Sequence, residues 1–212
     1  MKLGFIGYGS LGRQIERMLA EDGLVQPLAT TYFDDDASSN SHPNAVPFDS
    51  WQEDKYADFS FVVALGYKEL RIKHKLFEHL LRREREMFSA IHSSATISPS
   101  ATIGRGVVIF PGCVIDQYAK IGDGTVLYSR TTIAHDCRVG KSSFLAPSVT
   151  LAGNVTVGDR VFIGSGTCVA NTVQIADDCI VGIGSVITHD LSSGCSAIGN
   201  PIRILSKRLK LR

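Results

Sequence analysis

The stretch LAGNVTVGDRVFIGSG, residues 151–166, carries a six-residue period that decides the fold of the C-terminal half. Leu151, Val157 and Ile163 recur at this spacing, and Gly or Ala follows each of them. We call these aliphatic residues the leads of their hexads, and the position four residues after each lead is again small or apolar. Such a hexad predicts a short strand and a compact turn, and stacked strands build a solenoid. The unbroken aliphatic leads are Ile97, Ile103, Ile109, Ile115, Ile121, Leu127, Ile133, Val139, Leu145, Leu151, Val157, Ile163, Val169, Ile175, Val181 and Ile187.

This period resembles the left-handed parallel β-helix of hexapeptide-repeat acyltransferases, in which three hexads form one triangular coil. The left hand of the helix is implied by the resemblance alone, because right-handed crossovers are the general rule. The tail from Ile202 to Arg212, with four basic residues after Ser206, is expected to cover the last coil as a helix or a strand.

Cysteine usage argues against a metal site or a disulfide framework. The chain has five cysteines, an odd number, and no CxxC pair. Cys113, Cys137 and Cys179 fall at the small inward position of their hexads, so we interpret them as core residues. We therefore expect no bound metal.

Residues 1 to about 90 predict a small β-α-β unit with a parallel sheet. The expected elements are a strand at Lys2 to Ile6, a helix over Arg13 to Ala20, a strand ending in TTYFDDD, a strand at Phe59 to Leu65 and a helix from Glu69 to Glu86. A polar segment near residues 36–47 is expected to be a mobile loop.

The loop GYGSLG, residues 7–12, fits the glycine fingerprint of dinucleotide-binding turns, and Asp34 falls near the place of a ribose-binding carboxylate. The unit is too short for a full NAD-binding domain, so an NAD oxidoreductase is disfavoured. The same loop suits the diphosphate of a nucleotide sugar, because glycines allow close backbone approach and a helix N-terminus attracts negative charge. A turn without a ligand remains the alternative.

Composition excludes several classes of partner. The net charge is +1, from 22 basic and 21 acidic residues, so neither nucleic acid nor a membrane surface is expected to bind. No apolar run approaches the roughly 20 residues of a spanning helix. The start MKLGFIGYGSLG suits a buried strand and loop better than a signal peptide, which predicts a cytoplasmic location.

The hexad IAHDCR holds the candidate catalytic pair, His135 and Asp136, at an outward corner. Imidazole removes protons well near neutral pH, and an adjacent carboxylate fixes its tautomer. His189 and Asp190 form a second such pair that sequence alone does not separate from the first. With three hexads in a coil, however, Gly153 stacks beside His135, and its N–H is a plausible donor to an oxyanion.

Seven runs, in order along nearly the whole chain, resemble the bacterial sugar O- or N-acyltransferase family with hexapeptide repeats. This family includes sialic acid O-acetyltransferase-like and UDP-4-amino-sugar N-acetyltransferase-like enzymes. The resemblance implies a Rossmann-like nucleotide-sugar-binding unit over residues 1–90, a left-handed β-helix acyltransferase domain over 91–201 and a basic tail over 202–212. The runs are GYGSLG, TYFDDD, FVVALG, IHSSATISPSATIG, IAHDCRVG, LAGNVTVGDRVFIGSG and AIGNPIRIL.

The resemblance also implies the chemistry. The enzyme is expected to transfer an acyl group, by default acetyl, from acetyl-CoA to the amino group of a nucleotide-linked deoxy amino sugar in glycan or lipopolysaccharide synthesis. His135 is the implied base, Asp136 its orienter and Gly153 the oxyanion donor. Backbone around Ser165 and Ile183 would line the pantetheine. The implied sugar-nucleotide site is Gly9, Ser10, Leu11, Asp34 and Asp35.

Active sites between the subunits of a homotrimer are implied as well. The alternatives are O-acetylation of a sugar or sialic acid hydroxyl, and a binding scaffold without catalysis. Two positions depart from the family pattern: Leu11 and Phe144 each stand where relatives have histidine.

Overall fold

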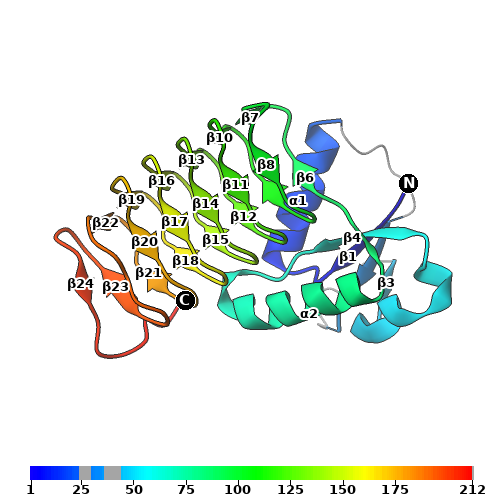
Figure 1. The fold of residues 1–212 in the computed structure, drawn as a ribbon. Coiled ribbons are helices and arrows are strands. Elements are labelled where there is room, and N and C mark those ends of the chain that lie inside the picture. The colour runs from blue at the N-terminus through cyan, green and yellow to red at the C-terminus, as the bar shows by residue number, and fades with distance from the viewer. Residues whose placement is uncertain (24–29, 36–43, 212) are drawn as a thin grey trace. The chain divides into compact units, whose positions relative to one another are not determined.

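A computed structural model describes residues 1–23, 30–35 and 44–211, and the chain separates into the units Met1–Ala90 and Ile91–Arg212 (Figure 1). Residues 36–43 of the expected mobile loop and the terminal Arg212 lie outside the described residues. In the described part of the chain, neither helix combines the length and the apolar character needed to cross a bilayer.

The first unit is built on one five-stranded sheet in the order β3-β2-β1-β4-β5, in which every neighbouring pair is parallel. β1 and β4 occupy the middle of the sheet and are almost wholly buried, which explains their continuous apolar sequences. The elements are β1 (Lys2–Ile6), α1 (Ser10–Glu21), β2 (Thr30–Phe33), β3 (Ala45–Val46), β4 (Phe59–Val63), α2 (Leu70–Arg82) and β5 (Glu86–Met87), with short 3-10 helices at Phe48–Gln52, Asp54–Tyr56 and Tyr67–Glu69.

Two expectations for this unit were wrong. The expected helix through Glu86 ends at Arg82, because Glu84 takes a left-handed backbone conformation (φ 54°) that an α-helix cannot continue. Glu86 instead begins β5. Part of the expected loop is a strand, since Ala45–Val46 pairs with β2.

In the second unit, each of the sixteen predicted leads is the last residue of a two-residue strand, from β7 (Thr96–Ile97) to β22 (Val186–Ile187). Register fixes the coil at 18 residues, because Ile115 pairs with Ile133 (133 − 115 = 18). The regular parallel strands form three faces and fit a left-handed β-helix (Figure 1). The strands between the first and last are β8 (Thr102–Ile103), β9 (Val108–Ile109), β10 (Val114–Ile115), β11 (Lys120–Ile121), β12 (Val126–Leu127), β13 (Thr132–Ile133), β14 (Arg138–Val139), β15 (Phe144–Leu145), β16 (Thr150–Leu151), β17 (Thr156–Val157), β18 (Phe162–Ile163), β19 (Cys168–Val169), β20 (Gln174–Ile175) and β21 (Ile180–Val181).

The three faces are named here in the order in which the chain meets them from β7. The first face contains β7, β10, β13, β16, β19 and β22, and the second contains β8, β11, β14, β17 and β20. The third face contains β6, β9, β12, β15, β18, β21, β23 and β24. The turn from the first face to the second is the first corner, and the turn from the third face to the first is the third corner.

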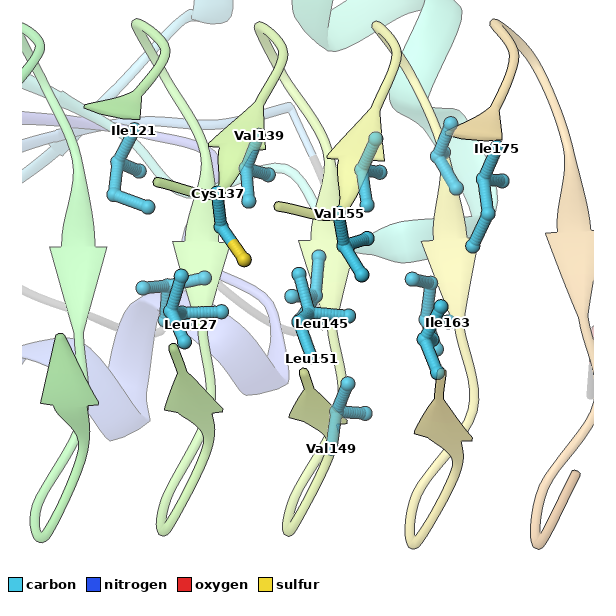
Figure 2. Close-up of a cluster of buried hydrophobic side chains, with 14 of the residues drawn as sticks. Ile121, Leu127, Cys137, Val139, Leu145, Val149, Leu151, Val155, Ile163 and Ile175 are labelled. Carbon is cyan, nitrogen blue, oxygen red and sulfur yellow. The ribbon is translucent and has the colours of Figure 1, made fainter. Parts of the chain in front are cut away.

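The leads fill the interior of the coils, where Leu127, Leu145 and Ile163 stack in successive layers (Figure 2). Each fully buried aliphatic side chain contributes about 1.5–3 kcal/mol, which makes the column the main source of stability. Hydroxyl groups inside the coils are hydrogen-bonded: Thr125 Oγ1 donates to Gly140 O at 2.7 Å, and Ser143 Oγ donates to Gly158 O at 2.9 Å.

The repeat differs from the sequence pattern at both ends. One further lead, Ile91 in β6 (Ala90–Ile91), precedes Ile97 in the same phase. The last coil is two residues shorter, since Val181 pairs with Ala197 in β23 (Ser196–Ile198) (197 − 181 = 16). β24 (Arg203–Ile204) then pairs antiparallel with β23, so the first part of the basic tail forms a strand.

Candidate active site

His135 and Asp136 occupy the first corner, between β13 and β14. Ile133 points into the coil, and the chain then turns outward, so the side chains of His135 and Asp136 are 53% and 48% exposed. Nδ1 of His135 lies 3.0 Å from Oδ2 of Asp136. If the carboxylate accepts the Nδ1 proton, Nε2 is left as the proton acceptor of the ring.

Gly153 stands one coil further on, and the imidazole ring lies against its backbone. A Cβ atom at this position would stand 2.6 Å from Nε2 and 2.7 Å from Cε1 of His135. Glycine is therefore required for the observed ring position. Asn154 N–H donates to His135 O at 3.0 Å and joins the two coils, while the N–H of Gly153 has no backbone partner within the described residues.

His189 and Asp190, the second pair, are arranged differently. Nδ1 of His189 lies 3.5 Å from Thr188 Oγ1. Asp190 Oδ1 instead accepts a hydrogen bond from Gln174 N–H at 2.8 Å. The carboxylate is thus engaged in joining two coils, and the structure separates the two His-Asp pairs that the sequence left equivalent.

Ser165 and Ile183 lie at the third corner, one coil apart, where Gly184 N–H donates to Ser165 O at 2.8 Å. Both are exposed, Ile183 to 69%. The first face separates this corner from His135. Within a single chain, the structure therefore does not bring the expected pantetheine-lining residues together with the candidate base.

The glycine loop joins β1 to α1. Gly7 has φ +86°, and a Cβ atom at Gly12 would stand 2.7 Å from Gly7 O, so both glycines serve the tight strand-to-helix turn. Gly9 is the N-cap of α1 without a side-chain cap, and a Cβ atom there would meet nothing within 4 Å. Space beside the backbone at Gly9 is therefore open.

The other predicted nucleotide-binding residues have partners of their own. Ser10 Oγ accepts from Gln14 Nε2 at 3.0 Å, and Leu11 is 8% exposed. Asp34 accepts from Tyr8 N–H and ties the loop to the end of β2, while Asp35 accepts from Phe48 N–H at 2.8 Å. Because the Leu11 side chain is buried, Leu11 can contact a ligand only through its backbone.

The structure reveals a cluster near this loop that sequence reasoning missed. The hydroxyls of Tyr8 and Tyr32 both donate to the Glu16 carboxylate, and the two ring centroids are 4.0 Å apart. Burial, together with the Glu16 carboxylate, raises the pKa of Tyr8 to about 12 and raises that of Tyr32 further. Nothing in the spacing of these residues along the chain signals that they meet.

The cysteine interpretation is confirmed, because Cys113, Cys137 and Cys179 are buried free thiols. Among the residues that the structure describes, no group of three or more His, Cys, Asp and Glu side chains could hold a metal ion.

Comparison with known proteins decides the family. Residues 87–189 match the family model described as the GMPPB C-terminal domain. PerB from Caulobacter crescentus, solved with CoA and GDP-perosamine, is 31% identical, covering 97% of this chain and 98% of its own, with a TM-score of 0.87. The chain belongs to the hexapeptide-repeat family of sugar acyltransferases.

Further members of this sugar acyltransferase family share the fold. The acetyltransferase domain of PglB from Neisseria gonorrhoeae is 28% identical, covering 96% of this chain and 99% of that domain, with a TM-score of 0.87. A variant of GDP-perosamine N-acetyltransferase from Caulobacter crescentus with one histidine replaced by alanine is 30% identical, covers 98% of both chains and has a TM-score of 0.86. No curated protein matches the sequence.

Proposed function

We propose that this chain transfers the acetyl group of acetyl-CoA to the amino group of a nucleotide-linked deoxy amino sugar. The observation that carries the proposal is the His135–Asp136 pair packed against Gly153, in a chain of this sugar acyltransferase family. The relative PerB was solved with CoA and GDP-perosamine, the same two classes of substrate.

The geometry supports direct transfer without a covalent enzyme intermediate. Nε2 of His135 removes a proton from the acceptor amine as its nitrogen attacks the thioester carbonyl. The N–H of Gly153 donates to the oxyanion that forms. Collapse breaks the carbon–sulfur bond, and the CoA thiolate takes up the proton, which leaves an amide and free CoA.

The two units are proposed to divide the substrates. Residues 1–90 act as a Rossmann-like unit that holds the sugar nucleotide, with Gly9, Ser10 and Leu11 offering backbone N–H groups. Asp34 and Asp35 are the proposed carboxylate contacts to ribose or base. Residues 91–201 carry the transfer, and the reaction is proposed to serve cytoplasmic glycan or lipopolysaccharide synthesis.

A homotrimer would complete the donor site. The outward positions of the first face carry no charge, and its two edges are the first and third corners. If three copies turn this face toward a common axis, the third corner of one copy meets the first corner of the next. Ser165 and Ile183 of one copy would then line the pantetheine beside His135 of its neighbour. The outward residues are Thr96, Val114, Thr132, Thr150, Cys168 and Val186.

The test is release of free CoA thiol from acetyl-CoA with a panel of nucleotide-linked 3-amino and 4-amino sugars, each paired with its hydroxyl counterpart. Turnover with one amino sugar, lost in His135→Ala, supports the proposal. Turnover with hydroxyl acceptors alone would establish O-acetylation, because the same base can deprotonate a hydroxyl. A chain that binds these sugars but never releases CoA would be a scaffold.

A further inference from the structure

The coil before His135 carries side chains that the fold does not use. Gln117 and Tyr118 occupy the first corner one coil earlier than His135 and Asp136 (135 − 117 = 18), and Asp136 N–H donates to Gln117 O at 2.9 Å. Gly153 flanks the base on the other side. His135 therefore lies between Gly153, which is the proposed acyl side, and the corner formed by Gln117 and Tyr118.

Tyr118 is unusual in its exposure rather than in its conformation. Its φ of 58° is the left-handed conformation that recurs at this position of other hexads, as at Arg130 and Asp136, so the turn imposes it. The side chain is 62% exposed, and in the described chain neither its ring nor its hydroxyl has a partner, although its N–H donates to Ser100 Oγ. A large aromatic side chain that is exposed and packs against nothing in the fold is available to a ligand.

Two unpaired cations lie on the second face beside this corner. Lys120 of β11 pairs directly with Arg138 of β14, and both side chains are exposed. Like charges placed opposite one another destabilise a sheet. In the described part of the chain, neither forms an ion pair. The nearby carboxylates are engaged, Asp116 by Gln117 N–H and Asp136 by His135.

We propose that Gln117, Tyr118, Lys120 and Arg138 form the acceptor subsite. The apolar face of the sugar packs on the Tyr118 ring, Gln117 bonds sugar hydroxyls, and Lys120 and Arg138 hold the sugar-linked phosphate. This proposal rests on the proposed function, since it presents the amine to Nε2 of His135 from the side opposite the acyl group. A diphosphate also occurs in CoA, so the experiment must separate the two substrates.

The first test compares the double variant Lys120→Gln/Arg138→Gln with Arg105→Gln. Arg105 is a matched control, because it is an exposed cation of the β-helix that already contacts Asp123. The KM for GDP-perosamine or the best amino sugar of the panel should rise about tenfold or more, while the KM for acetyl-CoA and the control stay unchanged. A rise for acetyl-CoA instead, or no change for either, overturns the proposal.

The second test uses Tyr118→Gly, which removes both the ring and the backbone strain. The melting temperature should stay the same or rise, whereas kcat/KM for the sugar nucleotide falls about tenfold. Tyr118→Phe keeps the stacking surface and should keep most of the activity. Unchanged kinetics in Tyr118→Gly would show that the ring does not contact the acceptor.

Calorimetric titration with GDP-perosamine separates failure of this proposal from failure of the proposed function, because binding needs no turnover. If the wild type binds but never releases CoA, the acetyltransferase proposal fails, and the subsite stands if Lys120→Gln/Arg138→Gln weakens binding. If the wild type binds no nucleotide amino sugar, both proposals fail.

Discussion

The first corner carries the dipeptide His-Asp twice, at 135–136 and at 189–190, and the two copies differ in everything except sequence. At the earlier position, the carboxylate contacts Nδ1 and the ring lies on Gly153. At the later position, the carboxylate accepts from Gln174 N–H, and the dipeptide itself lies in the coil that is two residues shorter. The His-Asp dipeptide alone therefore does not make a catalytic base with an oxyanion donor beside it. The regular coils on both sides of the dipeptide are also needed.

The largest expected effect separates the two histidines. His135→Ala should lower kcat by about 10²–10⁴-fold, the usual worth of general-base catalysis. His189→Ala should stay within about twofold of wild type, because its ring has neither an orienting carboxylate nor a glycine beside it. Steady-state thiol release measures both. Equal losses in the two variants would contradict the distinction drawn between the corners.

Gly153→Ala tests whether the glycine on the neighbouring coil sets the position of the His135 ring. The new methyl group would stand 2.6 Å from Nε2 and displace the exposed ring. We expect kcat to fall about 10²-fold, the cost of a misplacement near 1 Å. The melting temperature should change little, because the imidazole can swing into solvent. A variant with full activity would show that the ring position is not the catalytic one.

Asp136→Asn removes the orienting charge and keeps a side chain that tolerates the left-handed conformation of this residue (φ 60°). An amide holds the imidazole less strongly than a carboxylate, so kcat from steady-state thiol release should drop roughly tenfold. Asp190→Asn should keep the kcat of wild type, because Asp190 accepts from Gln174 N–H and not from an imidazole. An unchanged kcat in Asp136→Asn would argue against an orienting role.

The smallest effect concerns Cys137, which lies two residues after His135. Its thiol donates to Ala152 O at 3.0 Å, and burial raises its pKa, so it is a poor nucleophile. Cys137→Ser should keep kcat, measured by steady-state thiol release, within about threefold, because the buried thiol takes no part in direct transfer. An acetylated Cys137 trapped after mixing with acetyl-CoA would overturn direct transfer.

Much of the β-helix could be predicted because its core is periodic in sequence, so each aliphatic lead marks the position of one strand. The ends could not, since Ile91 stands beside the unrelated first unit in sequence and the shortened last coil moves Leu191 and Ala197 out of phase. In the first unit, the two-residue strands Ala45–Val46 and Glu86–Met87 are held by pairing with distant strands, and local pattern does not show such pairing.

The candidate site was predictable where it depends on stacking at a fixed interval, as for His135 and Gly153. Residues that meet through the fold of the first unit, such as Tyr8, Tyr32 and Glu16, were not. The positions of Ser165 and Ile183 at another corner follow from counting hexads around the triangle, which requires the assignment of strands to faces.

The most direct test of the central claim is the identity of the product formed from acetyl-CoA and a nucleotide-linked 4-amino sugar. Mass spectrometry should find one added acetyl group that survives hydroxylamine treatment, as an amide does. An added acetyl group that hydroxylamine removes would be an ester, and it would contradict transfer to the amine.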